Sequence, residues 1–257
     1  VLSSRLFFYF CFMKKLLPIL LFLLLFFPNL LFTQVINVEG KRQSDEKGWS
    51  GLTEFAFDYN QSTQTDWEFS NTSYLQWDNN KWSVLLLNEI NLDRAGGVDF
   101  ANDGYQHLRL SKHINETLTI ESFVQNQYDP IRNIENRKLG GLGLRAKLKN
   151  QNYFGIASFY ENEVLTNNIV DNALRLSAYL QLKMVLNTTL SLSTTTYLQP
   201  NFSQFSDCKM SNETTLLISI TDKFSFTNTV SGGYDTYPAV GIPELIYNFQ
   251  SGLIYEF

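Results

Sequence analysis

Cysteine and histidine are almost absent from this sequence of 257 residues. The cysteines are Cys11 and Cys208, and the histidines are His107 and His113. So few ligands cannot build a disulfide framework, a thiolate zinc site or a histidine-rich transition-metal centre. We therefore predict no metal site of these kinds and no cofactor, and only a hard-cation site made of carboxylates stays open as an alternative.

Positive charge is also scarce. The chain has 20 Lys and Arg residues against 25 Asp and Glu, which gives a net charge of -5 at pH 7. A nucleic-acid partner needs a basic surface that replaces phosphate counterions, and the sequence offers none. Proline is scarce as well, with 6 residues, whereas Phe and Tyr number 21 and 13. Few prolines and many aromatic residues favour β-strands.

The first long apolar run follows Met13. Two lysines come directly after Met13, an apolar stretch follows them, and the first acidic residue is Glu39. This is the layout of a secretory signal peptide. A permanent transmembrane anchor is the alternative, because about 20 apolar residues can span a bilayer. Pro28 near the end of the run, and the lack of a basic cluster after it, favour cleavage.

We place the cleavage close to Thr33 and Gln34. The predicted organisation is a signal peptide over residues 1–33, with Met13 as its true start, and one exported domain over residues 34–257.

The exported domain alternates apolar and polar residues with a period of two. Between Trp49 and Tyr59 the odd positions are apolar or neutral, whereas Ser50, Glu54 and Asp58 fall between them. Similar alternation returns over residues 107–110, 142–148 and 174–183, with turn-forming residues between the segments. We predict an all-β fold, a single antiparallel transmembrane β-barrel of about twelve strands that closes on its first strand. A soluble sandwich or lipocalin would also alternate, but with its apolar face inward.

The last residues carry a second signal. Gln250, Gly252, Tyr255 and Phe257 place a polar residue, a glycine and two aromatics at fixed spacing before the end of the chain. This spacing resembles the terminal-strand signal by which outer-membrane barrels are recognised by the barrel-assembly machinery. An ordinary edge strand that ends in Phe is the alternative. In a barrel, Tyr255 and Phe257 would face the outer-membrane lipid as part of an aromatic girdle.

Several phrases recur in an order and spacing typical of one family. They are VEGKR at 38–42, QHLR at 106–109, SFVQ at 122–125, RKLGGLGLR at 137–145, YENE at 160–163, TYLQP at 196–200 and SD at 206–207. Together they resemble the outer-membrane-barrel family catalogued as domain of unknown function 481, which includes proteins described as salt-induced outer membrane proteins. The resemblance implies a barrel in the cell outer membrane, and it implies no activity.

Projected inward, the alternation gathers charges of both signs in the lumen. The predicted luminal residues are Arg109, Glu121, Gln125, Arg145, Glu161, Glu163, Arg175, Tyr197, Gln199, Asp207, Lys209 and Glu213. Buried charges persist when they are paired, so we expect an ion-pair network that fills the barrel. A small pore whose selectivity these charges set is the alternative. Glu161 and Glu163, about 7 Å apart along a strand, could instead form a glycosidase or calcium site, but Arg145 and Arg175 offer simpler partners.

Catalysis has weak support. His107 is the sole candidate base, and Ser111 on the same strand lies about 13 Å away, too far for a direct hydrogen bond. The hypothesis is therefore a structural or envelope-stress barrel of the outer membrane that is not an enzyme, with a narrow pore as the alternative and a lipid-modifying enzyme as the second alternative.

The longest expected connections should share one end of such a barrel, because extracellular loops usually exceed periplasmic turns. They lie near residues 93–102, 129–136, 162–172, 199–207 and 235–245.

Overall fold

The computed structural model describes residues 35–42, 47–61, 63–221 and 223–255. The chain divides between Leu31 and Phe32 into two units, and all described residues belong to the second. The predicted signal peptide and the terminal Phe257 lie outside the described residues. Within them no helix is long and apolar enough to cross a membrane.

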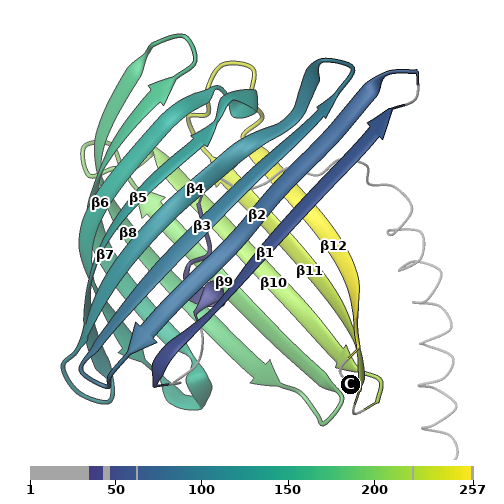
Figure 1. The fold of residues 1–257 in the computed structure, drawn as a ribbon. Coiled ribbons are helices and arrows are strands. Elements are labelled where there is room, and N and C mark those ends of the chain that lie inside the picture. Colours follow the sequence, from purple (N-terminus) through teal and green to yellow (C-terminus); the bar gives the residue numbers. More distant parts are fainter. Residues whose placement is uncertain (1–34, 43–46, 62, 222, 256–257) are drawn as a thin grey trace, which may run out of the picture. The chain divides into compact units, whose positions relative to one another are not determined.

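The described residues form twelve strands, each antiparallel to its neighbour in sequence, in one sheet of order β1 to β12 (Figure 1). The strands are β1 Gly48–Gln61, β2 Thr65–Asp78, β3 Trp82–Ala95, β4 Val98–His113, β5 Leu118–Asp129, β6 Ile134–Lys147, β7 Tyr153–Leu165, β8 Val170–Val185, β9 Leu190–Pro200, β10 Cys208–Ser219, β11 Phe224–Asp235 and β12 Leu245–Tyr255. Three short 3-10 helices accompany them, η1 Glu39–Lys41, η2 Pro130–Arg132 and η3 Lys149–Gln151. The predicted fold class, an antiparallel barrel of about twelve strands, is confirmed.

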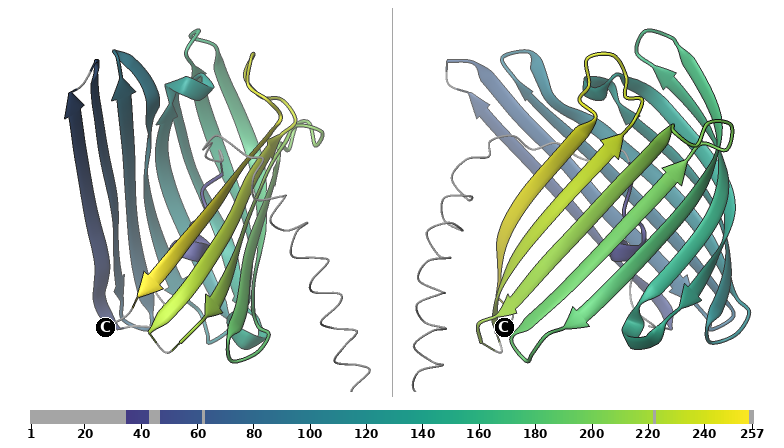
Figure 2. Two further views of the ribbon diagram at one scale, coloured as in Figure 1. Left: turned by 90° about the vertical axis from the view of Figure 1, so that its right-hand side faces the viewer. Right: turned by 180° about the vertical axis from the view of Figure 1, so that it is seen from behind.

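The sheet curls around a central lumen, with β1 and β12 as its two edges (Figure 2). The pairing of the last strand with the first, which the even strand number predicts, is absent from the described residues. All neighbouring strands in the sequence pair antiparallel. The register shifts by a residue or two in three of these pairs, at residues 93–94, 127–129 and 134–136, and is continuous in the others. Side chains therefore keep their face across neighbouring strands.

Alternation separates two very different surfaces. Leu85 and Leu87 of β3 point inward and are almost fully buried, whereas Leu86 between them is 44% exposed on the outside. The outward positions of β1 are the aromatic ones that the period-two pattern predicts, with Phe55 and Phe57 both about 70% exposed. The inward face, in contrast, carries most of the buried charged side chains, among them Arg109, Glu121 and Glu161. This polarity is the reverse of a soluble sandwich or lipocalin, so that alternative is excluded.

The connections differ between the two ends of the barrel. The end at which β1 begins and β12 ends has turns of three to five residues, at 79–81, 114–117, 148–152, 186–189 and 220–223. The opposite end carries the longest connections, 201–207 and 236–244, and all five connections that the sequence marks as long lie there.

Three of the five expected long connections are wrong in length. Those within residues 129–136 and 162–172 are four-residue turns, 130–133 and 166–169, no longer than the turns at the other end. The predicted connection over residues 93–102 is a two-residue turn, because β3 continues to Ala95 and β4 begins at Val98. Gly96 and Gly97 both have positive φ, 58° and 85°, the conformation that a tight two-residue hairpin turn requires. The strands therefore pair far beyond the 9–11 residues that a membrane crossing needs.

Glycines make room for the large inward side chains. A Cβ added to Gly155 of β7 would overlap the ring of Tyr179 on β8, so this ring lies directly over the bare backbone. Gly141 of β6 similarly accommodates Phe123 and Phe159. Gly140, on the outer face, is different, because its added Cβ would lie 3.6 Å from Val124, an ordinary contact.

Gly155→Val is expected to destabilise the barrel, whereas Gly140→Val is tolerated. Both substitutions add the same strand-forming side chain, but only the first displaces an inward ring, an overpacking that costs about 1–3 kcal/mol. The midpoint of urea unfolding, followed by the heat-dependent shift in gel mobility, measures the difference. Equal midpoints for the two variants would contradict the proposed packing of Tyr179 on Gly155.

Candidate functional site

Residues 35–42, called the luminal segment below, lie inside the barrel (Figure 1; Figure 2). Lys41 pairs with Glu89 of β3 at 2.7 Å, and Asn37 donates to Glu213 of β10 at 2.8 Å. Arg42 pairs with Glu121 of β5. Because these partners belong to strands on different sides of the curled sheet, a segment that contacts all of them occupies the lumen.

Glu39 is the centre of the polar contacts of this segment. Its side chain is 1% exposed and lies between two guanidinium groups, with Arg42 Nε at 2.9 Å and Arg145 Nε at 2.9 Å. Tyr179 donates its hydroxyl to Glu39 Oε2 at 3.0 Å, and the backbone N–H of Glu39 donates to the hydroxyl of Tyr197 at 3.3 Å. A buried carboxylate with this many donors is fully compensated.

These contacts decide the ionisation of Glu39. Burial alone would raise its pKa, but the positive charges of Arg42 and Arg145 outweigh burial and hold the pKa below its ordinary value. Glu39 is therefore an anion under all neutral and mildly acidic conditions.

Apolar contacts fix the same segment on two sides. Val38 is buried against Leu85 and Leu87 of β3, and Val35 is buried against Tyr179 of β8 and Tyr197 of β9. The segment thus bridges two separate parts of the wall. A link that combines ion pairs with buried valines holds the segment more firmly than either contact alone.

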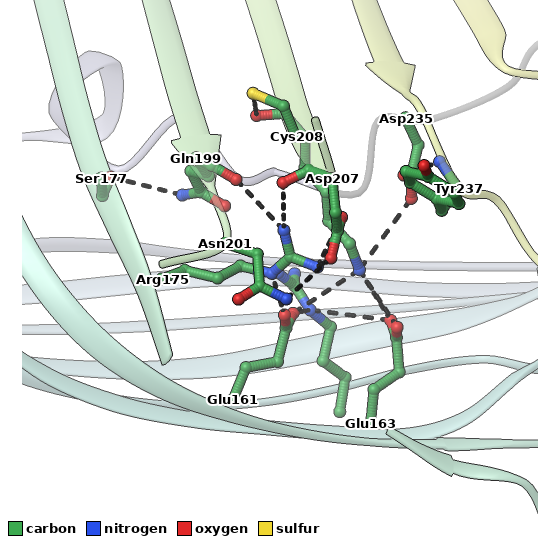
Figure 3. Close-up of polar contacts among 12 residues, drawn as sticks. Glu161, Glu163, Arg175, Ser177, Gln199, Asn201, Asp207, Cys208, Asp235 and Tyr237 are labelled. Carbon is green, nitrogen blue, oxygen red and sulfur yellow. Dashed lines mark hydrogen bonds and ion pairs between the residues drawn. The ribbon is translucent and has the colours of Figure 1, made fainter. Parts of the chain in front are cut away.

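A second group of charges, the Glu161 cluster, forms without the luminal segment (Figure 3). Glu161 of β7 is 1% exposed and pairs with Arg137 of β6, with Arg175 of β8 and, at 3.6 Å, with Lys209 of β10. Arg175 extends the cluster, because one of its terminal nitrogens donates to both carboxylate oxygens of Asp207 at 3.0 Å. Hydrogen bonds between a guanidinium and a carboxylate are strong because both groups are charged.

Lys209 closes the cluster. Its ammonium lies 3.1 Å from Glu163 and 4.0 Å from Asp235, so it joins β7, β10 and β11 (Figure 3). The oxygens of Glu161 and Glu163 are thus occupied by cations of the protein, which leaves the calcium hypothesis for this pair without support. Within the described residues no group of three or more His, Cys, Asp or Glu could hold a metal ion.

The structure places the predicted luminal charges in three groups. Arg109, Glu121 and Arg145 lie around the luminal segment, Glu161, Glu163, Arg175, Asp207 and Lys209 form the Glu161 cluster, and Glu213 accepts from Asn37. The expected pairing of Glu161 with Arg145 is wrong, since Arg145 binds Glu39 and Arg137 takes its place. The register explains the difference, because Arg137 lies opposite Glu163, whereas Arg145 lies opposite Gly155.

The sequence patterns did not point to Glu39, Lys41, Arg42 or Arg137 as luminal residues. Arg137 had a usable signal, because it is eight residues before Arg145 and hence on the same face of β6. The other three precede the first strand, where no period assigns a face.

The side chain of His107 is held by hydrogen bonds on both sides of its ring. It is 1% exposed, its Nδ1 lies 2.9 Å from the Gln125 side-chain oxygen, and its Nε2 accepts from Arg109 Nε at 3.2 Å. Ser111 donates instead to Glu121 at 3.2 Å. Gln199, the remaining predicted amide, donates to Ser177 at 3.4 Å. Both nitrogens of the imidazole are occupied, and the serine beside it serves an ion pair.

The residues of the predicted assembly signal lie in β12 as far as the structure describes them. Gln250 and Gly252 lie on the inner face, and Tyr255 is 60% exposed on the outer face, with its ring 6.4 Å from that of Phe224. Phe257 lies outside the described residues.

A small space remains beside the luminal segment. Its volume is about 110 Å³, and it lies between the segment and the walls of β3, β4, β5 and β10. Acidic side chains dominate its lining, namely Glu89, Asp103, Asp129 and Glu213, against the two basic residues Lys41 and Arg132. A space of this volume holds a few waters at most.

Comparison with known proteins places the chain in a defined group. A family model described as a protein of unknown function, DUF481, matches residues 53–257. A solved structure titled as the NanC porin in a rhombohedral crystal form covers 81% of this chain and 98% of its own, with a TM-score of 0.46 and 14% sequence identity. No curated protein matches the chain. The family match begins within β1, so the luminal segment precedes the matched range.

Glu39→Gln is expected to loosen the luminal segment and lower stability. The substitution removes the carboxylate that Arg145 binds and one of the two that Arg42 binds, and breaking a buried ion pair costs about 3–5 kcal/mol. Urea unfolding in detergent measures the loss, with Glu116→Gln in the exposed turn 114–117 as the matched control. If the two variants unfold at the same urea concentration, the pairing of Glu39 carries no stability.

Low pH is expected to remove the contribution of Glu39 to the free energy of unfolding. Since the pKa of Glu39 is lowered on folding, its stabilisation is fully present above the ordinary value of 4.5 and is lost as the pH falls through the depressed value. The unfolding midpoints of the wild type and Glu39→Gln should therefore differ by a constant amount from pH 7 to pH 5 and converge in stronger acid. A difference that already changes near pH 6 would contradict the charge state assigned to Glu39.

Proposed function

The chain belongs to the DUF481 family of proteins of unknown function, and from the interior of its barrel we propose that it is a structural barrel of the outer membrane, closed by its own luminal segment. The observation that carries this proposal is the binding of Glu39 between Arg42, Arg145 and Tyr179 in the middle of the lumen.

The outer surface supports the location. Most of its exposed large side chains are apolar, and aromatic rings gather at the end with the short turns, where Trp49 lies 6.4 Å from Trp77 and Phe224 lies 6.4 Å from Tyr255. Such rings belong at a membrane–water interface. We propose that the short turns face the periplasm and the longer connections face the exterior, and that outer-membrane lipid and the barrel-assembly machinery are the partners of the chain.

The lumen supports closure. The luminal segment lies at its centre, and the Glu161 cluster joins strands β6, β7, β8, β10 and β11 on one part of the wall. Ion pairs of this kind hold strands in register and resist deformation of the wall. A barrel filled in this way serves the strength of the envelope, which fits a structural or stress-related role.

A narrow pore is the second candidate, and the acidic space beside the luminal segment favours it. Glu89, Asp103, Asp129 and Glu213 would attract small cations if the segment moved. Removing the segment deletes two cations, Lys41 and Arg42, with only one anion, Glu39. An opened lumen would therefore prefer cations.

We propose no catalysis. In support, the imidazole of His107 is held by Gln125 and Arg109, and Ser111 is engaged with Glu121, so neither forms the nucleophile–base pair that a hydrolase requires.

Conductance in planar bilayers tests the closed state. Wild-type protein should give no regular single-channel steps, whereas the triple variant Glu39→Gln, Lys41→Gln, Arg42→Gln should give steps that are selective for cations. The matched control removes the same number of charges of each sign from exposed turns, as Glu116→Gln, Lys81→Gln, Lys149→Gln, and should stay silent.

The conductance of the triple variant is measured only on preparations whose gel mobility shifts on heating, because this shift shows that the barrel is folded. Steady wild-type channels would overturn closure in favour of the pore. Wild-type protein that is recovered from the periplasm, with no heat-dependent mobility shift, would overturn the outer-membrane location itself.

A further inference from the structure

A groove runs over the outer face of β3 to β7. Its volume is about 610 Å³, and it lies over Gly140, which has no side chain to fill it. Leu108, Val124 and Tyr160 form its outward walls. An apolar groove of this size on a lipid-facing surface is shaped to hold hydrocarbon.

A single cation marks one end of this groove. Lys138 lies two residues before Gly140 on the same face of β6, is exposed, and makes no ion pair with any described residue. The other outward-facing charges differ, because Arg94 pairs with Asp99 at 3.1 Å and Lys112 lies 5.3 Å from the ring centre of Trp82. A lysine on the lipid face lowers the stability of a barrel by about 2–4 kcal/mol at the midplane of the membrane. At the headgroup level, where an anion can lie beside the ammonium, it lowers the stability little.

Amide groups surround Lys138. Asn136 donates to Asn126 at 3.0 Å, and Asn126 donates to Gln106 at 3.2 Å, which makes a polar ladder across β6, β5 and β4 on the outer face. Each of these amide nitrogens has two hydrogens, and the ladder uses one of them. Donors are therefore left over for hydroxyl and phosphate oxygens of a bound molecule.

Depth identifies the leaflet. Lys138 is four residues from Ile134, where β6 begins at the end of the barrel with the longer connections. This is about 13 Å along a tilted strand, so the ammonium lies near the headgroup level of the leaflet on that side. If the longer connections face the exterior, as proposed above, this leaflet is the outer one, in which the phosphorylated acyl lipid is lipopolysaccharide.

We propose that the groove binds lipopolysaccharide, with an acyl chain over Gly140, a phosphate group at Lys138, and sugar hydroxyls at the amides of Gln106 and Asn126. This inference rests on the proposed location in the outer membrane. Lipopolysaccharide fits better than a phospholipid, because its sugar rings hold hydroxyl groups on a rigid frame beside the phosphate, whereas the hydroxyl groups of phosphatidylglycerol are on a flexible glycerol.

Native mass spectrometry of the folded, full-length barrel tests the site. The protein is equilibrated in mild detergent with rough-type lipopolysaccharide or, in a separate arm, with phosphatidylglycerol, and the fraction of barrel with bound lipid is titrated. Wild type should bind one lipopolysaccharide at least tenfold more tightly than phosphatidylglycerol. Lys138→Gln, and separately Gly140→Leu, should lose at least tenfold in affinity.

Lys112→Gln is the matched control, since it removes an outward-facing lysine at the opposite end of the barrel and should bind like the wild type. Equal affinity of Lys138→Gln and wild type, equal binding of the two lipids, or a dimer mass that excludes lipid would each overturn the site. These outcomes, obtained with heat-modifiable protein from outer membranes, would leave the proposed function intact. If the protein is absent from outer membranes, the proposed function itself is wrong, and the lipid site is wrong with it.

Discussion

The ionised side chains buried deepest in this barrel lie against opposite charge, and this requirement organises the centre of its interior. Burying an unpaired carboxylate or guanidinium would cost several kcal/mol. Glu39 meets it through Arg42 and Arg145, and Glu161 meets it through Arg137 and Arg175. Because the partners come from different strands, satisfying each charge also fixes the strands relative to one another.

The luminal segment follows from the same requirement. Arg145 projects from β6 into the lumen, but Glu161 and Glu163 are already paired with Arg137 of the same strand and with Lys209. Glu39 supplies the opposite charge for Arg145, and Arg42 adds a second cation to Glu121, which also pairs with Arg109. Buried Val35 and Val38 add apolar contact with the wall. The position of the luminal segment is thus a consequence of charge balance as much as of shape.

The outer face obeys the opposite rule, since hydrocarbon accepts apolar side chains and rejects unpaired charge. Its departures from that rule are therefore informative. Arg94 and Asp99 neutralise each other near the strand ends, and Lys112 lies over Trp82. Lys138 stands apart beside a groove without a side chain on its floor. One alternating pattern thus produces a charged inner face on one side of the sheet and a largely apolar outer face on the other.

The sequence by itself determined the strands, their antiparallel order and which residues share a face, because these depend on a period of two that is local in the chain. It also placed Arg109, Glu121, Arg145 and Glu161 on the inner face. Only the tertiary structure decided which luminal acid forms an ion pair with which luminal base. Arg145 and Glu39 are separated by 106 residues, and strand register and tilt, which no local pattern records, bring them together. The burial of the luminal segment could not be predicted from the sequence either, because a segment outside every strand has no alternating pattern that assigns its side chains to a face.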